Sequence, residues 1–258
     1  MTRGEQELSS ILNLQRLLAT PHTAEQISTL WTAYHASRSG GTGRGFICGS
    51  ISLSMYEMMI MNGRSYPSFV VPVGRVTHPS ETSETSQSPE SSLDRQEKAA
   101  HEFYYLQWDF HPPPPIPSGS DDPFLKPLYT NSAGVSNPPI STVLFAPLQE
   151  YKLRQAFATP YLALTMYTDL ASSHGIVLLR GEITPSASAV QGSSSDRYLI
   201  SQEVAQLLTI ALQRFYLWTK EGSSEESGKE VMKLLTGFHK KPEEFEWRDL
   251  LKFSNPTL

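Results

Sequence analysis

The chain has 258 residues, of which 39% are apolar and 18% charged, and its formal net charge is −5. Lys and Arg are scattered rather than gathered in a stripe, which argues against a nucleic-acid partner. No apolar run approaches the roughly 20 residues that span a bilayer, so we expect no membrane insertion. The single cysteine, Cys48, excludes an intrachain disulfide framework.

The chain opens with a predicted amphipathic helix over residues 5–18. Its aliphatic side chains cover more of the circumference than docking on one side requires, so we expect some of them to be exposed. An exposed apolar helix is suited to lie in a groove of a partner. The alternative is a terminal helix that its own domain buries on two sides. The residues predicted to bind a partner are Leu8, Ile11, Leu14, Leu17 and Leu18.

A second predicted helix is followed by a glycine-rich connection. Thr23 and Gln26 form a capping-box pattern at the start of this helix. Gly40 and Gly45 have the separation of the outer glycines of a P-loop, but Phe46 stands where the phosphate-binding Lys would be. We therefore interpret the glycines as a flexible connection between a helix and a strand, and we expect no nucleotide cofactor.

Two strands and a helix are predicted next. Residues 46–53 and 66–75 have the apolar content of strands, and between them a helix over 54–63 is expected to be closed by Gly63. Pro72 cannot donate a ladder hydrogen bond. It therefore predicts that its strand lies at an edge or contains a bulge.

Polar inserts interrupt the pattern near residues 77–99, 111–123 and 184–197. The first is too polar to pack and is predicted to be disordered. The second is rich in proline and reads as a stiff extended linker, although a scaffold that offers it to a recognition domain is an alternative. Residues 101–110, between these two inserts, are predicted to form a strand.

The second half of the chain contains three further predicted strands, at residues 141–148, 161–167 and 175–183. Their content of β-branched and aliphatic residues favours strands. The last two are close in sequence and are expected to pair antiparallel.

The strongest helical pattern follows these strands and is expected to pack on the sheet. After it, residues 220–230 are predicted to be a solvated break, and two short helical pieces separated near Pro242 end the chain. The predicted fold is α+β, a mostly antiparallel central sheet packed with helices, in a single domain over residues 23–258 that the helical segment 1–22 precedes. The apolar residues of the strong helix are Ile200, Val204, Leu207, Leu208, Ala211, Leu212 and Phe215.

Convergent catalytic groups are scarce in the sequence. The seven histidines are isolated from one another and neither an HExxH nor a CxxC motif occurs, so we predict no metal site. Arg180 and Glu182 are interpreted as an ion pair on a strand. His35 is interpreted as a helix-terminal side chain that satisfies backbone carbonyls. An enzyme of unrecognised class with a site around His35, Arg180 and Glu182 stays as the alternative.

Seven stretches, in the same order along the chain, resemble the mitochondrial assembly chaperones that bind free beta subunits of the ATP synthase catalytic sector. Each is weakly specific by itself, but the shared order is informative. They are EQISTLWTAYH, YPSFVVPVGR, FYYLQW, STVLFAPLQEYKLRQAFATPYLALTMYTDL, GIVLLRGEI, the EVAQLL and RFY portions of one helix, and FEWRDLLKF.

The resemblance implies a function in binding rather than in catalysis. It implies a monomeric chaperone of the mitochondrial matrix that holds the unassembled beta subunit, prevents its aggregation and hands it to the alpha subunit. It transfers no catalytic residues and no cofactor. The import signal of such a protein is expected to have been removed or to be missing from this chain.

Overall fold

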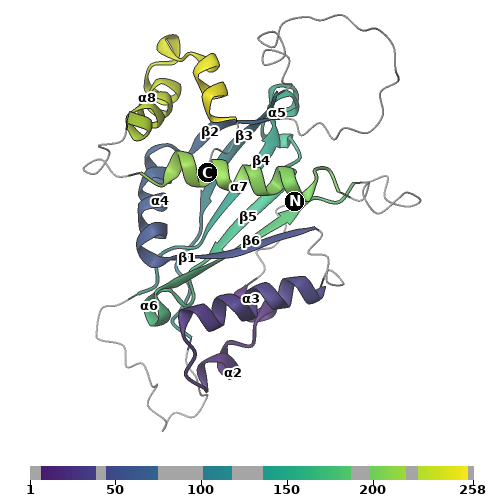
Figure 1. The fold of residues 1–258 in the computed structure, drawn as a ribbon, viewed down its shortest axis with the longest axis vertical. Coiled ribbons are helices and arrows are strands. Elements are labelled where there is room, and N and C mark those ends of the chain that lie inside the picture. Colours follow the sequence, from purple (N-terminus) through teal and green to yellow (C-terminus); the bar gives the residue numbers. More distant parts are fainter. Residues whose placement is uncertain are drawn as a thin grey trace, which may run out of the picture.

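A computed structural model describes residues 7–38, 45–74, 101–117, 136–186, 198–218 and 226–254. These residues contain a six-stranded sheet in which every neighbouring pair is antiparallel, with helices packed on it (Figure 1). The predicted α+β class is confirmed. In the order of the sheet, the strands are β1 (Phe46–Ser52), β6 (Ile176–Ile183), β5 (Leu162–Tyr167), β4 (Ser141–Pro147), β3 (His101–Phe110) and β2 (Ser68–Gly74).

Strand pairing follows the sequence prediction closely. β5 and β6 pair antiparallel as expected, with Leu164 opposite Gly181. The strand predicted to contain Pro72 is β2, and it lies at one edge of the sheet. Because β1 and β2 form opposite edges, the helix that joins them, α4 (Leu53–Ser65), has to cross the sheet.

One face of the sheet is covered by α4 and by α7 (Gln202–Tyr216), with α8 (Glu226–Lys240) beside them (Figure 1). The helix predicted to be strongest is α7, and it packs on the sheet as expected. A buried amide ties the two covering helices together, since Asn62 Nδ2 donates to the carbonyls of Tyr216 and Trp218 at 2.8 and 2.9 Å. The chain then continues through the 3-10 helices η2 (Pro242–Glu244) and η3 (Trp247–Phe253).

Two predictions about this layer are wrong in detail. Gly63 does not close α4, which continues to Ser65. A Cβ at position 63 would lie 2.9 Å from the ring of Trp108, so glycine permits close approach of the helix to the sheet. The break expected over residues 220–230 is shorter at its end, because α8 begins at Glu226.

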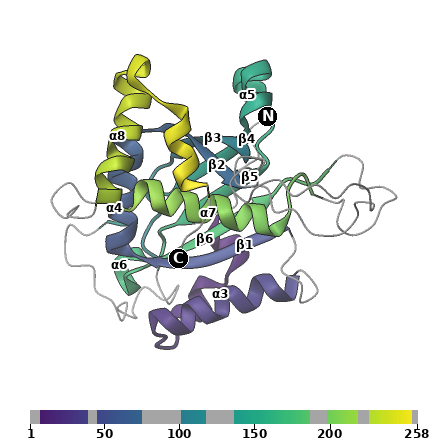
Figure 2. The same cartoon turned by 45° about the horizontal axis from the view of Figure 1, so that its top comes forward.

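The opposite face is covered over β1 and β6 by α3 (Ala24–Arg38), and Figure 2 shows α3 and α7 on opposite sides of these strands. The indole nitrogen of Trp31, a fully buried side chain, donates to the carbonyl of Leu179 at 2.9 Å. The predicted capping box is present: the Thr23 N–H donates to Gln26 Oε1 at 2.9 Å, and the Gln26 N–H to Thr23 Oγ1 at 3.3 Å.

The N-terminal segment is not one helix over 5–18. It consists of α1 (Leu8–Ile11) and α2 (Leu14–Leu18). Leu12 between them is extended, and Asn13 begins the second helix by accepting a hydrogen bond from the Arg16 N–H at 2.9 Å. The Asn cap offers the backbone a local alternative to a continuous helix.

The polar inserts fall mostly outside the described residues, including all of 77–99 and most of 184–197. Residues 111–117 carry no regular secondary structure, in agreement with the linker prediction. Their carbonyls at Pro114 and Pro115 lie 3.4 and 3.5 Å from the Asn137 amide nitrogen. The same nitrogen donates to the Asp169 carbonyl at 3.1 Å, so Asn137 holds this segment against the chain after β5.

Asp169, which follows β5, stands out among the described acidic residues by its raised pKa. Burial, with a smaller contribution from the Glu7 carboxylate, raises its pKa from 3.8 to about 6. Among the described residues, no hydrogen bond reaches its Oδ2. The folded state therefore binds more protons than the unfolded state between about pH 4 and pH 6. Stability is consequently lost as the pH rises through this window.

We expect Asp169→Asn to raise the melting temperature at pH 7.5, on the order of 5 °C, because the amide carries no charge to desolvate. Near pH 3.5, where the wild-type carboxyl is largely protonated in both states, the two melting temperatures should converge. Thermal melts across this pH range measure the difference. Equal melting temperatures at pH 7.5 would contradict the assignment.

Candidate interaction surface

A short segment after β4 projects from the end of the sheet. It consists of α5 (Leu148–Arg154) and the 3-10 helix η1 (Gln155–Phe157), and we call residues 148–157 the α5–η1 protrusion. Figures 1 and 2 both show α5 standing beyond the end of β4, away from α3 and α7. None of its residues is buried. This element was not predicted from the sequence.

The base of the protrusion is anchored to the sheet. The Tyr151 ring stacks on the Tyr105 ring of β3, with centroids 3.7 Å apart. Glu150 Oε1 accepts a hydrogen bond from the Thr159 N–H at 3.1 Å and lies 3.5 Å from Arg154 Nη1. These contacts fix the direction of the helix. Because the base is fixed, the fold itself holds the tip in its exposed position.

The tip presents two large apolar side chains to solvent. Leu153 is 85% exposed and Phe157 is 88% exposed, whereas the other exposed large hydrophobic residues of the described chain lie between 37% and 52%. Full burial of such a side chain by a partner is worth about 1.5–3 kcal/mol. Both lie in one short segment, and exposed apolar side chains that gather in one place mark interaction sites.

The backbone of the tip has an unusual conformation. Gln155 lies between the two apolar residues. Its φ of 52° is the one positive φ among the non-glycine residues that the structure describes. Such a conformation costs about 1–3 kcal/mol and clusters at functional sites. Lys152 and Arg154 stand beside Leu153 in the sequence, so the tip combines apolar side chains with positive charge. It suits an apolar recess bordered by carboxylates.

The residues predicted from the sequence to bind a partner lie elsewhere. Leu8, Ile11, Leu14, Leu17 and Leu18 are between 1% and 9% exposed and form a second core cluster with Trp31, Tyr167 and Leu178. The expected exposure of this segment is wrong. The break near Leu12 turns α1 and α2 relative to a single straight helix, and the alternative of burial by the chain's own domain describes what is seen.

The three residues of the alternative enzyme site do lie near one another. Arg180 Nη2 lies 3.4 Å from Glu182 Oε1, as the ion-pair interpretation predicts. The Arg180 guanidinium stands 5.1 Å above the Phe46 ring, whose other neighbours include His35 at 5.8 Å between rings.

The geometry of His35 favours a structural role. It is 2% exposed, and its Nδ1 lies 3.0 Å from the Trp31 carbonyl, so this nitrogen carries the hydrogen. Burial lowers the pKa of the imidazole. The helix-terminal interpretation of His35 is thereby confirmed, and the cluster fastens the end of α3 to β6 and β1.

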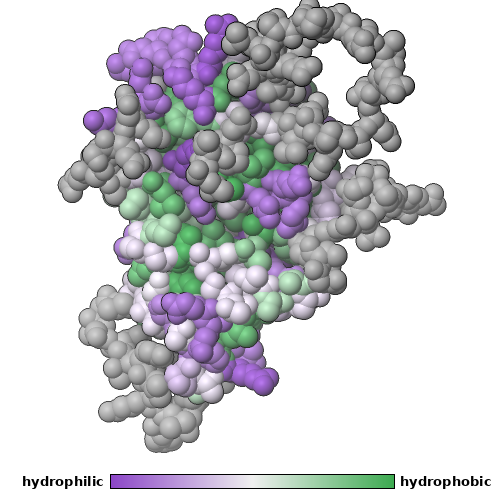
Figure 3. All heavy atoms as spheres, viewed as in Figure 1, coloured by the Kyte–Doolittle hydropathy of each residue, from purple (hydrophilic) through white to green (hydrophobic). Residues whose placement is uncertain are grey.

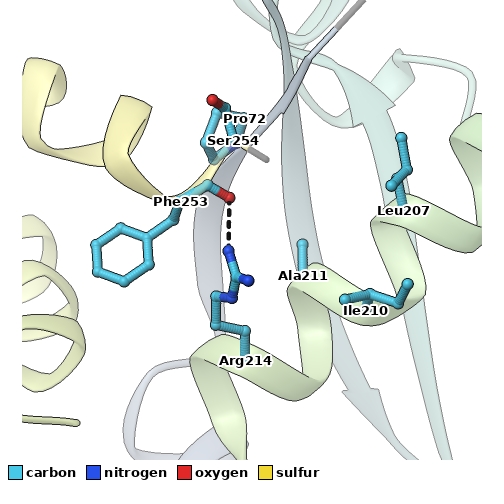
Figure 4. A pocket seen from close by; sticks show the side chains of 7 residues that line it. All are labelled: Pro72, Leu207, Ile210, Ala211, Arg214, Phe253 and Ser254. Atoms are coloured by element: carbon cyan, nitrogen blue, oxygen red, sulfur yellow. Dashed lines mark hydrogen bonds between the residues drawn. The ribbon is translucent and has the colours of Figure 1, made fainter. Parts of the chain in front are cut away.

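A small depression lies between α7, β2 and the last 3-10 helix, η3 (Figure 4). Its volume of about 10 Å³ is that of a single water site. Arg214 Nη1 crosses it to donate to the Phe253 carbonyl at 3.1 Å. The depression therefore anchors the C-terminal segment and has no room for an organic ligand.

The rest of the described surface offers fewer candidate binding sites. Figure 3 shows hydrophilic residues over α8 and hydrophobic ones in the middle of the same face, around α4 and α7. Within the described ranges, no group of His, Cys, Asp and Glu is arranged to hold a metal ion. No helix in those ranges combines the length and apolar character that a membrane crossing needs.

Comparison with known proteins identifies the family. A family model described as ATP11 protein matches residues 1–251, so the chain belongs to this family. The chain is also 25% identical over 235 residues to Protein atp11, mitochondrial, of Schizosaccharomyces pombe. That match covers 90% of this chain and 57% of the relative, so the chain spans little more than half the length of the relative. The family resemblance inferred from the seven stretches is confirmed.

We expect Leu14→Asp with Leu17→Asp to unfold the chain or to lower its melting temperature by more than 10 °C, because each change places a charge in the second core cluster. Gln15→Asp, which places one such charge on the exposed side of α2, is the control. Circular dichroism melts of the three proteins measure the effect. A double variant as stable as the control would show that the cluster is not a core.

Proposed function

We propose that this member of the ATP11 family is an assembly chaperone of the mitochondrial ATP synthase. In this proposal it binds the unassembled beta subunit of the catalytic sector F(1) in the matrix, prevents its aggregation and hands it to the alpha subunit. Family membership, the mitochondrial relative and the ordered resemblance of the seven stretches support the proposal. The chain is proposed to act by binding alone, as a monomer and without a cofactor.

The single observation that carries the binding role is the tip of the α5–η1 protrusion. Leu153 and Phe157 are almost fully exposed although their helix is anchored at its base. An unassembled subunit exposes an interface of mixed apolar character that would otherwise self-associate. Two rigidly presented apolar side chains can enter such an interface with little loss of conformational entropy. We therefore assign the first client contact to this tip.

Release needs no nucleotide cycle in this proposal. A chaperone that binds the free subunit lowers the concentration of the aggregation-prone species by mass action. The alpha subunit then displaces the chaperone if its interface with beta is better fitted or larger. The P-loop pattern fails at Phe46, where a phosphate-binding lysine would stand, which agrees with release by competition.

We expect Leu153→Ser with Phe157→Ser to abolish suppression of beta-subunit aggregation while the melting temperature changes by no more than about 2 °C, because surface substitutions away from packed groups are nearly neutral. Light scattering of the isolated beta subunit with increasing chaperone measures the suppression.

Leu30→Ser is the matched control for this pair, since Leu30 is 46% exposed on α3, away from the protrusion. It should suppress aggregation as the wild type does. Full activity of the double variant would place the client contact elsewhere. Failure of the wild type to retain the beta subunit would overturn the proposed function itself.

We also expect purified alpha subunit, but not ATP with magnesium, to release the chaperone from its complex with beta. Gel filtration of the preformed complex after each addition separates the two cases. The expected result is an alpha–beta complex and free chaperone only where alpha was added. Stoichiometric micromolar binding of ATP to the chaperone in a calorimetric titration would contradict release by competition.

A further inference from the structure

β1 forms one edge of the sheet and β2 the other. The two edge strands differ in how their outward backbone groups are satisfied. At one end of β1 the Ile183 N–H donates to the Gly45 carbonyl at 3.0 Å, and at the other the Leu53 N–H donates to the Gly175 carbonyl at 2.9 Å. In an antiparallel ladder every second residue turns its N–H and C=O toward the neighbouring strand. The odd-numbered residues of β1 therefore face β6.

The even-numbered residues of β1 face away from the sheet. Gln202 Nε2 donates to the outward carbonyl of Phe46 at 2.6 Å, which agrees with this alternation, and Ser52 is the N-cap of α4. The two even-numbered residues in the middle of β1, Cys48 and Ser50, are left to consider. Over the described part of the chain, no hydrogen bond reaches the outward N–H or C=O of either residue.

The opposite edge, β2, is treated differently. There the Trp108 N–H donates to the Pro67 carbonyl, so the even-numbered residues of β2 face outward. Of these four residues, all but Val70 have an outward group that is hydrogen-bonded or lack the outward N–H. His239 Nε2 contacts the Ser68 carbonyl, Pro72 has no N–H, and the Gly74 N–H donates to the Ser254 carbonyl at 3.3 Å. Proteins usually protect an edge strand in such ways against pairing with another chain.

In its middle, at Cys48 and Ser50, β1 has none of these protections within the described residues. Its sequence, FICGSIS, contains neither proline nor a charged residue, although charges on edge strands are a common defence. Figure 2 shows β1 at the near edge of the sheet, between α7 on one side and α3 on the other. Its backbone therefore offers a hydrogen-bonding template to which the complementary group is another extended strand.

Gly49 adds a preference for a side chain. A Cβ built at Gly49 would have no atom within 4 Å, and its partner on β6, Leu179, belongs to the main core. A residue placed opposite Gly49 by an added strand would form a non-hydrogen-bonded pair, the kind in which side chains come closest. The space above Gly49 would then receive a large apolar side chain of that strand.

We infer that β1 accepts an extended, uncharged segment of the unassembled beta subunit as an added strand, with a large apolar residue opposite Gly49. This inference rests on the proposed function and deepens it. The α5–η1 protrusion engages an apolar recess of the client, whereas β1 satisfies the backbone of a client segment that has no partner strand before assembly. The two contacts use different elements and can be separated by mutation.

The first test is residue-resolved amide hydrogen exchange of the full chain, alone and with the isolated beta subunit. In the free chain the Ile47, Gly49 and Ile51 amides should be protected by β6, and the Cys48 and Ser50 amides should exchange faster. With the beta subunit, exchange at Cys48 and Ser50 should slow by at least about tenfold, as expected for newly formed ladder hydrogen bonds.

The second test compares Ser50→Pro with Ser50→Ala. Both substitutions remove the hydrogen bond of 2.8 Å between the Ser50 and Ser28 hydroxyls, but only proline also removes the outward N–H, and proline is tolerated on edge strands. We expect Ser50→Pro to weaken binding of the beta subunit at least about tenfold relative to Ser50→Ala. Gly49→Leu, which fills the space above β1, should weaken it as well and serves if the proline variant does not fold.

The outcomes distinguish the two proposals. A wild-type chain that forms no complex with the beta subunit overturns both. A complex in which the Cys48 and Ser50 amides keep their free exchange rates, with Ser50→Pro and Gly49→Leu binding as Ser50→Ala does, overturns the strand-addition inference alone. A concentration-dependent dimer that protects the same two amides without the beta subunit also overturns it, because the occupant is then a second copy of the chain.

Discussion

The constraint on which the whole structure depends is the need of the sheet to bury its apolar side chains and to satisfy its two edges. α4 and α7 cover one face, and α3 with the N-terminal helices covers the other over β1 and β6. The β2 edge is satisfied in part, by His239, by the C-terminal segment and by Pro72. Among the described residues, Val70 of β2 and the two consecutive outward positions Cys48 and Ser50 of β1 are left to be satisfied by solvent or by a partner.

Buried polar contacts decide how these layers are held. Trp31 reaches the Leu179 carbonyl from one face, and Asn62 reaches the Tyr216 and Trp218 carbonyls on the other. Each of these donors links segments far apart in the sequence, and loss of its acceptor would leave a buried polar group without a partner. The layers are thus fixed in register, so that β1 lies between α3 and α7 and the α5–η1 protrusion projects from another end of the sheet.

A chaperone that acts by binding alone has to expose apolar or unpaired groups without aggregating itself. The two sites proposed for this chain are small and separate: two side chains on a short anchored segment, and two residues of one edge strand. Neither site is large enough to form a stable interface by itself. In the proposed function, a client that engages both gains the advantage of linked binding, and a competitor that removes either contact starts its release.

The sequence by itself determined the elements whose evidence is local. Alternating apolar residues predicted the strands, the spacing from Val204 to Phe215 predicted α7, Pro72 predicted an edge, and Thr23 with Gln26 predicted the start of α3. The order of seven stretches indicated the family. Each of the signals for a strand, a helix or an edge lies within a few residues of the feature that it predicts, so no knowledge of distant contacts was required.

Only the tertiary structure decided which apolar residues are exposed and which backbone groups face outward. The leucines of α1 and α2 and the tip residues Leu153 and Phe157 are equally apolar, but a second core cluster buries the first set and nothing in the described chain covers the second. The direction of the Cys48 and Ser50 amides likewise depends on the register between β1 and β6, which are more than 100 residues apart in the sequence. Burial of these leucines and the register between β1 and β6 depend on packing between segments that are distant in the sequence.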